Sequence, residues 1–170
     1  MRRCLDHLTG IDYPRDRLLI SPRGDDQASA AHLAEVPGDA TEVPFYLWDD
    51  HFMFAGGAVG AYEGMTWFVD SGLVVVDLDG VQAGLRADTE TLLSWGVIDS
   101  PDDTTEILDL GMDLALGPLV QPGHTVHHDS TEHGNWDFGG VQTDGLLGHA
   151  FLAEYAWTLD FDAMRYRFTP

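Results

Sequence analysis

The sequence predicts an all-β fold, a small closed barrel that carries one or two short helices. Three observations lead to this class. From residue 42 onward, apolar and polar residues alternate in short runs rich in aromatic and β-branched side chains, which is typical of strands. Glycine pairs and acid–glycine pairs interrupt these runs, as expected of hairpin turns. Only two stretches space their apolar residues as a helix does, so strands predominate.

The first half of this region contains four predicted strands. Their lengths and their content of aromatic and β-branched residues both fit a half-buried sheet. Gly56-Gly57 and Glu63-Gly64 are the predicted hairpin turns between them. The four predicted strands cover residues 43–48, 51–54, 65–69 and 73–78.

The second half mixes helices with strands. Residues 87–95 have apolar side chains at helical spacing, and Gly96 provides the stop. A second short helix is predicted over residues 148–156, whereas residues 124–137 are polar and are predicted to be a loop. The remaining segments are strand-like, and the last two form a closing hairpin. These predicted strands cover residues 107–110, 112–120, 157–161 and 164–168.

The composition bounds the partners of the protein. A chain of 170 residues can bury one core, or one domain plus the remnant of another. All eight basic residues are arginine, and the formal net charge is −21. A surface this negative repels phosphates and anionic membranes, so neither nucleic acid nor a membrane is an expected partner. The charge is typical of a halophilic protein, whose self-repulsion is screened by salt, but an ordinary acidic protein fits equally well.

Cys4 is the only cysteine, so the sequence predicts neither a disulfide framework nor a thiolate zinc site. No apolar stretch is long enough to span a bilayer. The N-terminal Met1-Arg2-Arg3 is not followed by the apolar segment of a signal peptide. We therefore expect a cytoplasmic protein.

The N-terminal segment resembles the C-terminus of the same chain. Ile11-Asp12-Tyr13 aligns with Leu159-Asp160-Phe161, and Ser21-Pro22 aligns with Thr169-Pro170 at the same spacing. A match this short also arises by chance. If it is a true repeat, the N-terminus is the last hairpin of a missing copy, and it could pair with an exposed sheet edge. The predicted division is then a tail over residues 1–23, a linker over 24–40 and a domain over 41–170.

Two short motifs carry the functional hypothesis. Trp67-Phe68-Val69-Asp70-Ser71-Gly72 is an apolar run that ends in an acid, a hydroxyl residue and a glycine. Asp144-Gly145-Leu146-Leu147-Gly148 places an apolar pair between glycines. The first motif alone could be an ordinary turn, in which a carboxylate accepts backbone N–H bonds. Together and in this order, they resemble the active-site half of a retropepsin-like aspartic protease domain of the bacterial and archaeal type. The resemblance covers about residues 41–170 and implies the barrel of that family.

The resemblance implies a role for each residue of the two motifs. Asp70 would be the catalytic acid, Ser71 would tie its loop to a partner loop, and Gly72 would allow the two backbones to approach. The supporting wall would be Leu146, Leu147 and Gly148 with the helix that follows. Aspartic proteases hold two carboxylates that share one proton. Because the chain has a single Asp-Ser/Thr-Gly, the second acid would come from a second copy in a homodimer.

Two features depart from the family pattern. Leu73 follows the loop, where active members carry a small or hydroxyl residue that lines the substrate. The flap hairpin of the family is not evident either, and residues 112–138 are where we expect it. Both departures bear on activity more than on fold.

Four histidines suggest a different kind of site. Imidazole and carboxylate groups bind zinc and other divalent ions. The spacing of these histidines is not that of two ligands on one helix face, and no cysteine supports them. Four histidines in a polar loop are more often solvated surface residues, and no cofactor is expected. The weak metal candidates are His124, His127, His128 and His133.

Two functions follow from the sequence. The first is an aspartic endopeptidase that hydrolyses peptide bonds in peptide or protein substrates, with water activated between two Asp70 carboxylates, one per subunit. The second is a catalytically inactive domain of the same fold that acts as a binding or assembly module. Leu73 and the N-terminal tail favour the second function.

Overall fold

The computed structural model describes residues 18–21, 38–48, 52–131, 136–138 and 141–170. Strands hold 50% of these residues and helices 9%, which confirms the predicted all-β class. The described helices are two short ones, α3 (Thr89–Trp95) and α4 (His149–Leu152). The strands are β1 (Leu18–Ser21), β2 (Thr41–Trp48), β3 (Phe52–Val59), β4 (Tyr62–Val69), β5 (Leu85–Asp88), β6 (Ile107–Asp109), β7 (Leu114–Leu116), β8 (Leu119–Gln121), β9 (Thr125–Asp129), β10 (Trp136–Phe138), β11 (Val141–Thr143), β12 (Gly145–Leu147), β13 (Ala156–Asp160) and β14 (Arg165–Thr169).

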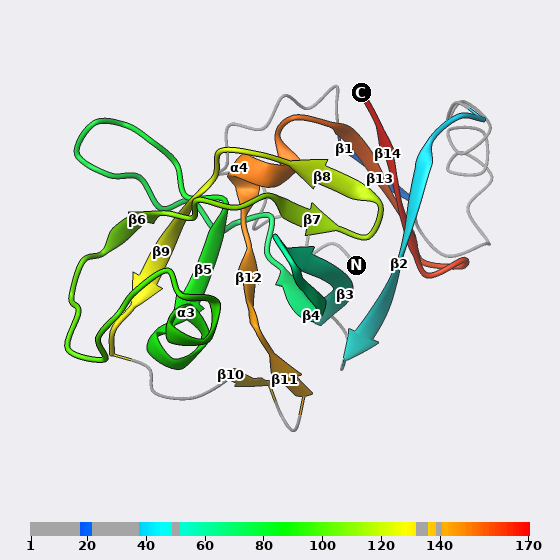
Figure 1. Cartoon of the computed structure of the whole chain (residues 1–170). Coiled ribbons are helices and arrows are strands. Elements are labelled where there is room, and N and C mark those ends of the chain that lie inside the picture. Colours follow the sequence, from blue (N-terminus) through cyan, green and yellow to red (C-terminus); the bar gives the residue numbers. More distant parts are fainter. Residues whose placement is uncertain (1–17, 22–37, 49–51, 132–135, 139–140) are drawn as a thin grey trace.

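One large sheet dominates the molecule. Its strands follow the order β1-β13-β14-β2-β3-β4-β12-β5-β9-β6, and β7 and β8 branch from β3. The hairpin β10–β11 is a separate two-stranded sheet. Figure 1 shows β12 between β4 and β5, with α4 at its upper end. The prediction of a closed barrel is wrong, because the sheet is open and its end strands, β1 and β6, do not pair with each other.

The sheet divides at β3 instead of closing. One edge of β3 pairs with β4, whereas the other edge is shared: residues 52–55 pair with β2 and residues 57–59 with β7. At the change of partner, the Trp67 indole N–H donates to the Ala115 carbonyl oxygen at 2.7 Å. A Cβ atom at Gly57 would lie 2.0 Å from Trp67 Nε1 and 2.1 Å from that oxygen. The edge of β3 therefore changes partner where only glycine fits.

The core lies between the sheet and the helices that pack on it. Trp67, Leu85, Val126 and Leu147 come from four neighbouring strands and are 0% exposed. Trp95 of α3 packs edge-on against Trp67, with 6.1 Å between the ring centroids. Burial of large side chains of this kind is the main source of the stability of the sheet.

The predicted helix over residues 87–95 is confirmed as α3. The Asp88 side chain caps its first turn by accepting a bond from the Thr91 amide at 2.8 Å. Gly96 ends it in the left-handed conformation, with φ of 70°. The second predicted helix is confirmed only as the four residues of α4.

Several local predictions are wrong. Gly56 and Gly57 lie inside β3, and Gly60, with φ of 53°, occupies the turn before β4. The predicted strand over residues 73–78 is a connection with a single β-bridge at Val76, and its residues alternate between half-buried and exposed. Residues 125–129, predicted to be loop, form β9 because its inner side chains enter the core. Strand β5 was missed because it has only four residues and immediately precedes a helix.

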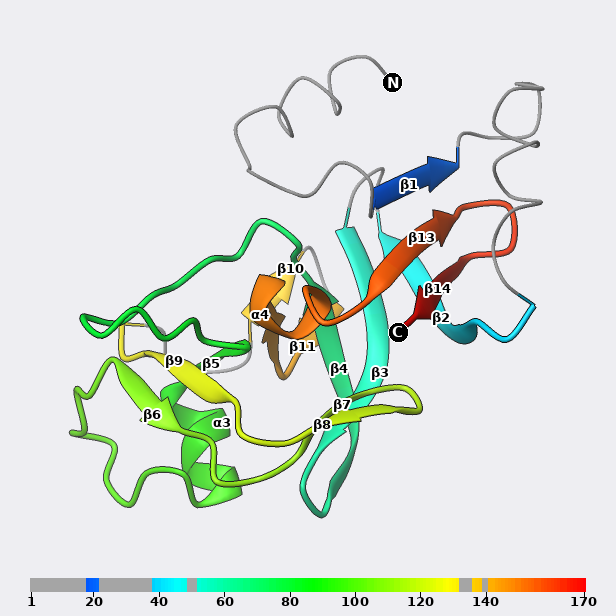
Figure 2. The ribbon, with the colours of Figure 1, turned by 90° about the horizontal axis from the view of Figure 1, so that it is seen from above.

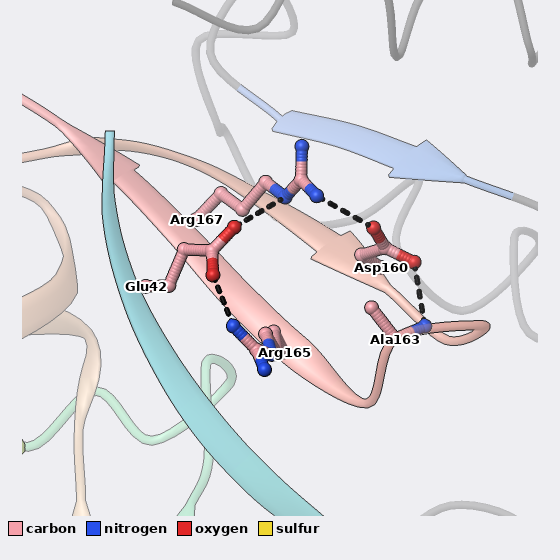
Figure 3. Close-up of polar contacts among 5 residues, drawn as sticks. All are labelled: Glu42, Asp160, Ala163, Arg165 and Arg167. Atoms are coloured by element: carbon pink, nitrogen blue, oxygen red, sulfur yellow. Dashed lines mark hydrogen bonds and ion pairs between the residues drawn. The ribbon is translucent and has the colours of Figure 1, made fainter. Parts of the chain in front are cut away.

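The closing hairpin β13–β14 is confirmed, and it carries an ion-pair network. Glu42 of β2 pairs with Arg165 and Arg167 of β14, and Arg167 also reaches Asp160 at 3.2 Å. Asp160 in turn accepts a bond from the Ala163 amide at 2.9 Å in the hairpin turn (Figure 3). These contacts fasten β2 to the hairpin. On the other side of β13, β1 pairs in parallel, so residues 18–21 form one edge of the sheet (Figure 2).

Within the described residues, neither helix has the length or the apolar character needed to cross a membrane.

Candidate active site

Asp70 directly follows β4, one of the central strands of the sheet. Val69, before it, is 3% exposed, while Asp70 itself is half-buried. Strand β4 pairs with β3 on one side and with β12 on the other. The backbone at Asp70 is therefore held from both sides, and the carboxyl group lies where the sheet meets solvent.

The residues after Asp70 form a tight turn around its carboxylate. The Gly72 amide donates to Asp70 Oδ1 at 2.9 Å, and the Leu73 amide donates to the Asp70 carbonyl oxygen at 3.1 Å. Such a turn orients one carboxylate oxygen and leaves the other available for further contacts. Ser71, between them, is half-buried.

The structure brings the two motifs together, although they lie more than seventy residues apart in the sequence. Strand β12 runs parallel to β4, with Leu146 opposite Phe68 and Leu147 opposite Val69. The Asp70 amide donates to the Leu147 carbonyl oxygen at 2.9 Å. Leu146, Leu147 and Gly148 thus lie directly beside the Asp70 loop.

The beginning of α4 is bonded to the same loop. The His149 amide donates to the Leu73 carbonyl oxygen at 3.0 Å, and the Gly148 amide donates to the Gly84 carbonyl oxygen at 2.9 Å. Residues on both sides of the 73–84 connection are therefore bonded to one short segment. The backbone groups of Asp70, Leu73 and Gly84 are thus all hydrogen-bonded to residues 147–149, at the end of β12.

Two glycines permit this close approach. A Cβ atom at Gly145 would lie 2.7 Å from the Arg86 carbonyl oxygen, and one at Gly148 would lie 3.0 Å from that of Leu73. The same position at Gly148 is 3.3 Å from Leu73 Cδ2. The Leu73 side chain is thus directed toward Gly148 and is half-buried against the supporting segment.

Sequence reasoning missed a clamp on β4. The Thr66 amide donates to Asp144 Oδ2 at 2.7 Å, and the Thr143 hydroxyl donates to the Thr66 carbonyl oxygen at 2.7 Å. The Phe68 amide donates to the same hydroxyl at 3.2 Å. Asp144 therefore has a structural task, and the polar Thr-Asp pair before Gly-Leu-Leu-Gly was the available signal.

The candidate metal histidines do not converge in the described residues. His127 and His128 are neighbours in β9, so their side chains point to opposite faces. His128 is buried and lies 2.9 Å from the Thr89 hydroxyl, whereas His127 is half-buried. Among the described residues no group of three metal-binding side chains occurs, and His133 lies outside them.

His124 is half-buried in the short connection between β8 and β9. Its Nε2 lies 2.6 Å from Gln121 Oε1, and its ring packs on Phe151 with 5.7 Å between centroids. Burial lowers the pKa of His124, and burial also lowers the pKa of His149, because the charged imidazolium loses hydration. Both rings are therefore held in their neutral form more strongly than in water.

The segment in which we expected a flap contains the β7–β8 hairpin. Its strands pair with each other, and β7 pairs with β3. The Gln121 side chain at its end donates to the Phe151 carbonyl oxygen of α4 at 3.0 Å. The hairpin is thus joined to the supporting helix.

Comparisons with protein-family models, with curated proteins and with solved structures find no match to this chain.

Proposed function

We propose that the chain is an aspartic endopeptidase of the retropepsin-like type, active as a homodimer with one Asp70 from each subunit. One observation carries the proposal: Asp70, at the end of a central strand, is bonded through its amide to Leu147 of the apolar-apolar-glycine segment. An aspartate in an ordinary surface turn would not require a supporting segment bonded to its backbone. The proposal includes the cytoplasmic location expected from the single cysteine.

The chemistry follows from two carboxyl groups close together. Like charges at short range cannot both ionise, so the pair holds one proton. The ionised Asp70 takes a proton from water as the water oxygen attacks the peptide carbonyl carbon. The protonated Asp70 of the other subunit donates to the carbonyl oxygen. When the C–N bond breaks, the leaving nitrogen receives a proton and the pair returns to its starting state.

The surrounding residues position this pair. The Gly72 amide, 2.9 Å from Asp70 Oδ1, fixes the orientation of the carboxylate. Ser71 adjoins it and is the residue that we assign to bracing the two loops across the dimer. Leu147, Gly148 and His149 hold the backbone of the loop, so its geometry is preorganised before substrate arrives.

Dimer formation must overcome the charge of the chain. Two subunits with formal charges of −21 each repel at low ionic strength. Salt at about 1 M shortens the screening length to about 3 Å and removes most of this repulsion. We therefore expect dimer formation and activity to increase together as KCl is raised, which sedimentation and cleavage assays at matched salt measure.

The direct test compares three proteins. Cleavage of an unstructured protein substrate is measured between about pH 3 and 7, in molar KCl, with and without pepstatin. Wild type should cleave and be inhibited, whereas Asp70→Asn should lose at least about 1,000-fold in rate. Asp109→Asn is the matched control, because the Gly111 amide donates to Asp109 Oδ1 at 2.9 Å in a similar turn. Its rate should stay within about twofold of wild type.

The second candidate is a catalytically inactive binding or assembly module. The observation that favours it is the Leu73 side chain, which lies against Gly148 where the family carries a small or hydroxyl residue. A folded dimer that cleaves nothing, with Asp70→Asn indistinguishable from wild type, would establish this alternative. Cleavage retained in Asp70→Asn would contradict the role of Asp70 altogether.

A further inference from the structure

The connection from β4 to β5 contains a hairpin over residues 75–83. The Ala83 amide donates to the Val75 carbonyl oxygen at 2.9 Å, and the Asp77 amide donates to the Val81 carbonyl oxygen at 3.0 Å. Val76 and Gln82 form the antiparallel bridge between these bonds. Figure 1 shows this green connection extending away from the sheet at the upper left.

The tip of hairpin 75–83 has a defined shape. Asp77 Oδ1 accepts bonds from the Asp79 amide at 2.9 Å and from the Val81 amide at 2.8 Å. Gly80 adopts φ of 86°, which its neighbours could not adopt without strain. The tip is therefore a built turn rather than a loose end.

Hairpin 75–83 exposes apolar side chains to solvent. Leu78 at the tip is fully exposed, and Val76 and Val81 are each about half exposed, as is Val74 just before the hairpin. Val74, Val76 and Leu78 alternate along one strand of the hairpin and so share a face, whereas Val81, opposite Asp77, lies on the other face. Exposed apolar side chains gathered on one face in this way mark interaction sites. Its base is fixed, because Leu73 and Gly84 are both bonded to the segment behind Asp70.

The charges around this surface select its partner. Residues 71–85 contain Asp77 and Asp79 and no basic residue. Of the eight arginines, five precede residue 24, and the other three are Arg86, Arg165 and Arg167. Each of these three is already ion-paired, Arg86 with Asp129 and the other two as Figure 3 shows. The described body thus offers a basic ligand many carboxylates and no competing free cation.

We propose that hairpin 75–83 is a docking site, outside the Asp70 loop, for a polypeptide that is both basic and apolar. The apolar side chains of the ligand cover Val74, Val76 and Leu78, and its basic residues lie beside Asp77 and Asp79. If the chain is a peptidase, such polypeptides are its substrates, and the site recruits them next to Asp70. The tip lies at most about 17 Å along the chain from Leu73, so one ligand of about ten extended residues reaches both.

A second copy of the chain fits this surface less well. Two hairpins docked on each other would bring four carboxylates together without a cation. A basic ligand should associate with the hairpin faster than a second copy does, because opposite charges raise the association rate and like charges lower it. Charge complementarity therefore decides between the two occupants.

The experiment uses the full-length Asp70→Asn protein, so that binding is measured without cleavage. Two fluorescently labelled peptides of about twelve residues share the same leucine and valine positions, and one carries lysines where the other carries glutamates. We expect the basic peptide to bind at least about tenfold tighter at about 0.1 M KCl, with the difference shrinking at about 1 M. A third peptide, with the lysines kept and the apolar residues changed to serine, should lose about tenfold.

Two protein variants locate the site. Leu78→Ser together with Val76→Ser should weaken binding of the basic peptide by about tenfold or more. Tyr46→Ser is the matched control, because Tyr46 is an exposed aromatic residue on β2, which β3 separates from β4 and the hairpin, and should leave binding unchanged. Thermal unfolding of each variant checks that the surface changes leave the fold intact.

Three results would overturn the proposal. Equal affinity for the basic and acidic peptides removes the charge argument, and unchanged binding in the Leu78→Ser/Val76→Ser protein places the site elsewhere. A hairpin variant that converts a dimer to a monomer without affecting peptide binding identifies a second copy as the occupant. Because the assay needs no catalysis, peptide binding by a wild type that cleaves nothing would contradict the peptidase and leave the docking site standing.

Discussion

Two turns in this molecule share the same hydrogen bond between an aspartate side chain and a glycine amide but have different surroundings. Asp70 and Asp109 each stand at the end of a strand, and each accepts a bond from the amide of a glycine two residues later at 2.9 Å. Asp70 ends a central strand, and its amide is bonded to Leu147. Asp109 belongs to β6, the last strand of the sheet, and is exposed. The local hydrogen bond is common to ordinary turns, so the partners of the flanking backbone separate a candidate site from a simple turn.

The residue between acid and glycine differs as well. Ser71 is polar and half-buried, whereas Leu110 is 2% exposed and its amide donates to the His124 carbonyl oxygen at 3.0 Å. One turn presents a hydroxyl group near the surface, and the other uses its middle residue to fill the core. The Asp109 turn is therefore explained fully by packing.

The largest expected effect on stability comes from replacing a glycine near the Asp70 turn, compared with a glycine in the Asp109 turn. Gly145→Ala places a methyl group 2.7 Å from the Arg86 carbonyl oxygen, so the backbone of β12 must shift. We expect a loss of about 3 kcal/mol in the free energy of unfolding. Gly111→Ala meets no atom within 4 Å but keeps φ of 64°, and should lose about 1 kcal/mol. Urea unfolding measures both, and equal losses would show that the backbone around Asp70 is packed no more tightly than the Asp109 turn.

Replacing either aspartate, Asp70 or Asp109, should lower the free energy of unfolding by a smaller and similar amount. Asp70→Ala and Asp109→Ala each remove a carboxylate that accepts one glycine amide, at a cost of about 1 kcal/mol in the free energy of unfolding. The cleavage rate should separate them, because only Asp70 lies in the proposed active site. A much larger stability loss for Asp70→Ala would indicate that this carboxylate is chiefly structural.

The smallest expected effect comes from the histidines beside the two turns. Burial lowers the pKa of His124, near the Asp109 turn, and of His149, near the Asp70 turn, below the ordinary value of 6.5. The unfolded chain then binds more protons than the folded one as the pH falls below about 6.5. Stability from these groups is complete above that pH and is lost on acidification.

Urea unfolding at about pH 7.5 and 5.5, in about 1 M KCl to screen the carboxylates, measures this loss. His124→Gln and His149→Gln should each reduce it. A wild type that is more stable at about pH 5.5 than at about pH 7.5 would contradict the assignment of neutral rings.

Part of the fold was readable from the sequence. The all-β class, α3 with its Gly96 stop and the closing hairpin rest on local signals, namely alternation, helical spacing and turn residues. Closure of the sheet is not local. The division at β3 depends on which strands reach its second edge, and Gly56-Gly57 gives the same local signal whether it forms a turn or lies inside a strand.

The candidate site shows the same limit. The sequence identified the Asp70 and Leu146-Leu147-Gly148 motifs, and the structure places them side by side. The Thr143-Asp144 pair marked the clamp on Thr66 only as a polar pair, because its partner lies 77 and 78 positions away in the sequence. The four histidines were grouped by sequence proximity, but strand alternation sends His127 and His128 to opposite faces.

Gly57 has a consequence for tracing distant relatives. Any larger residue there would collide with the Trp67 indole and the Ala115 carbonyl, so the position tolerates no drift while the arrangement persists. The spacing of Gly57, Trp67 and Asp70 should therefore be conserved longer during divergence than most of the sequence around it. A search that gives extra weight to this spacing would detect distant homologues whose overall sequence identity is low.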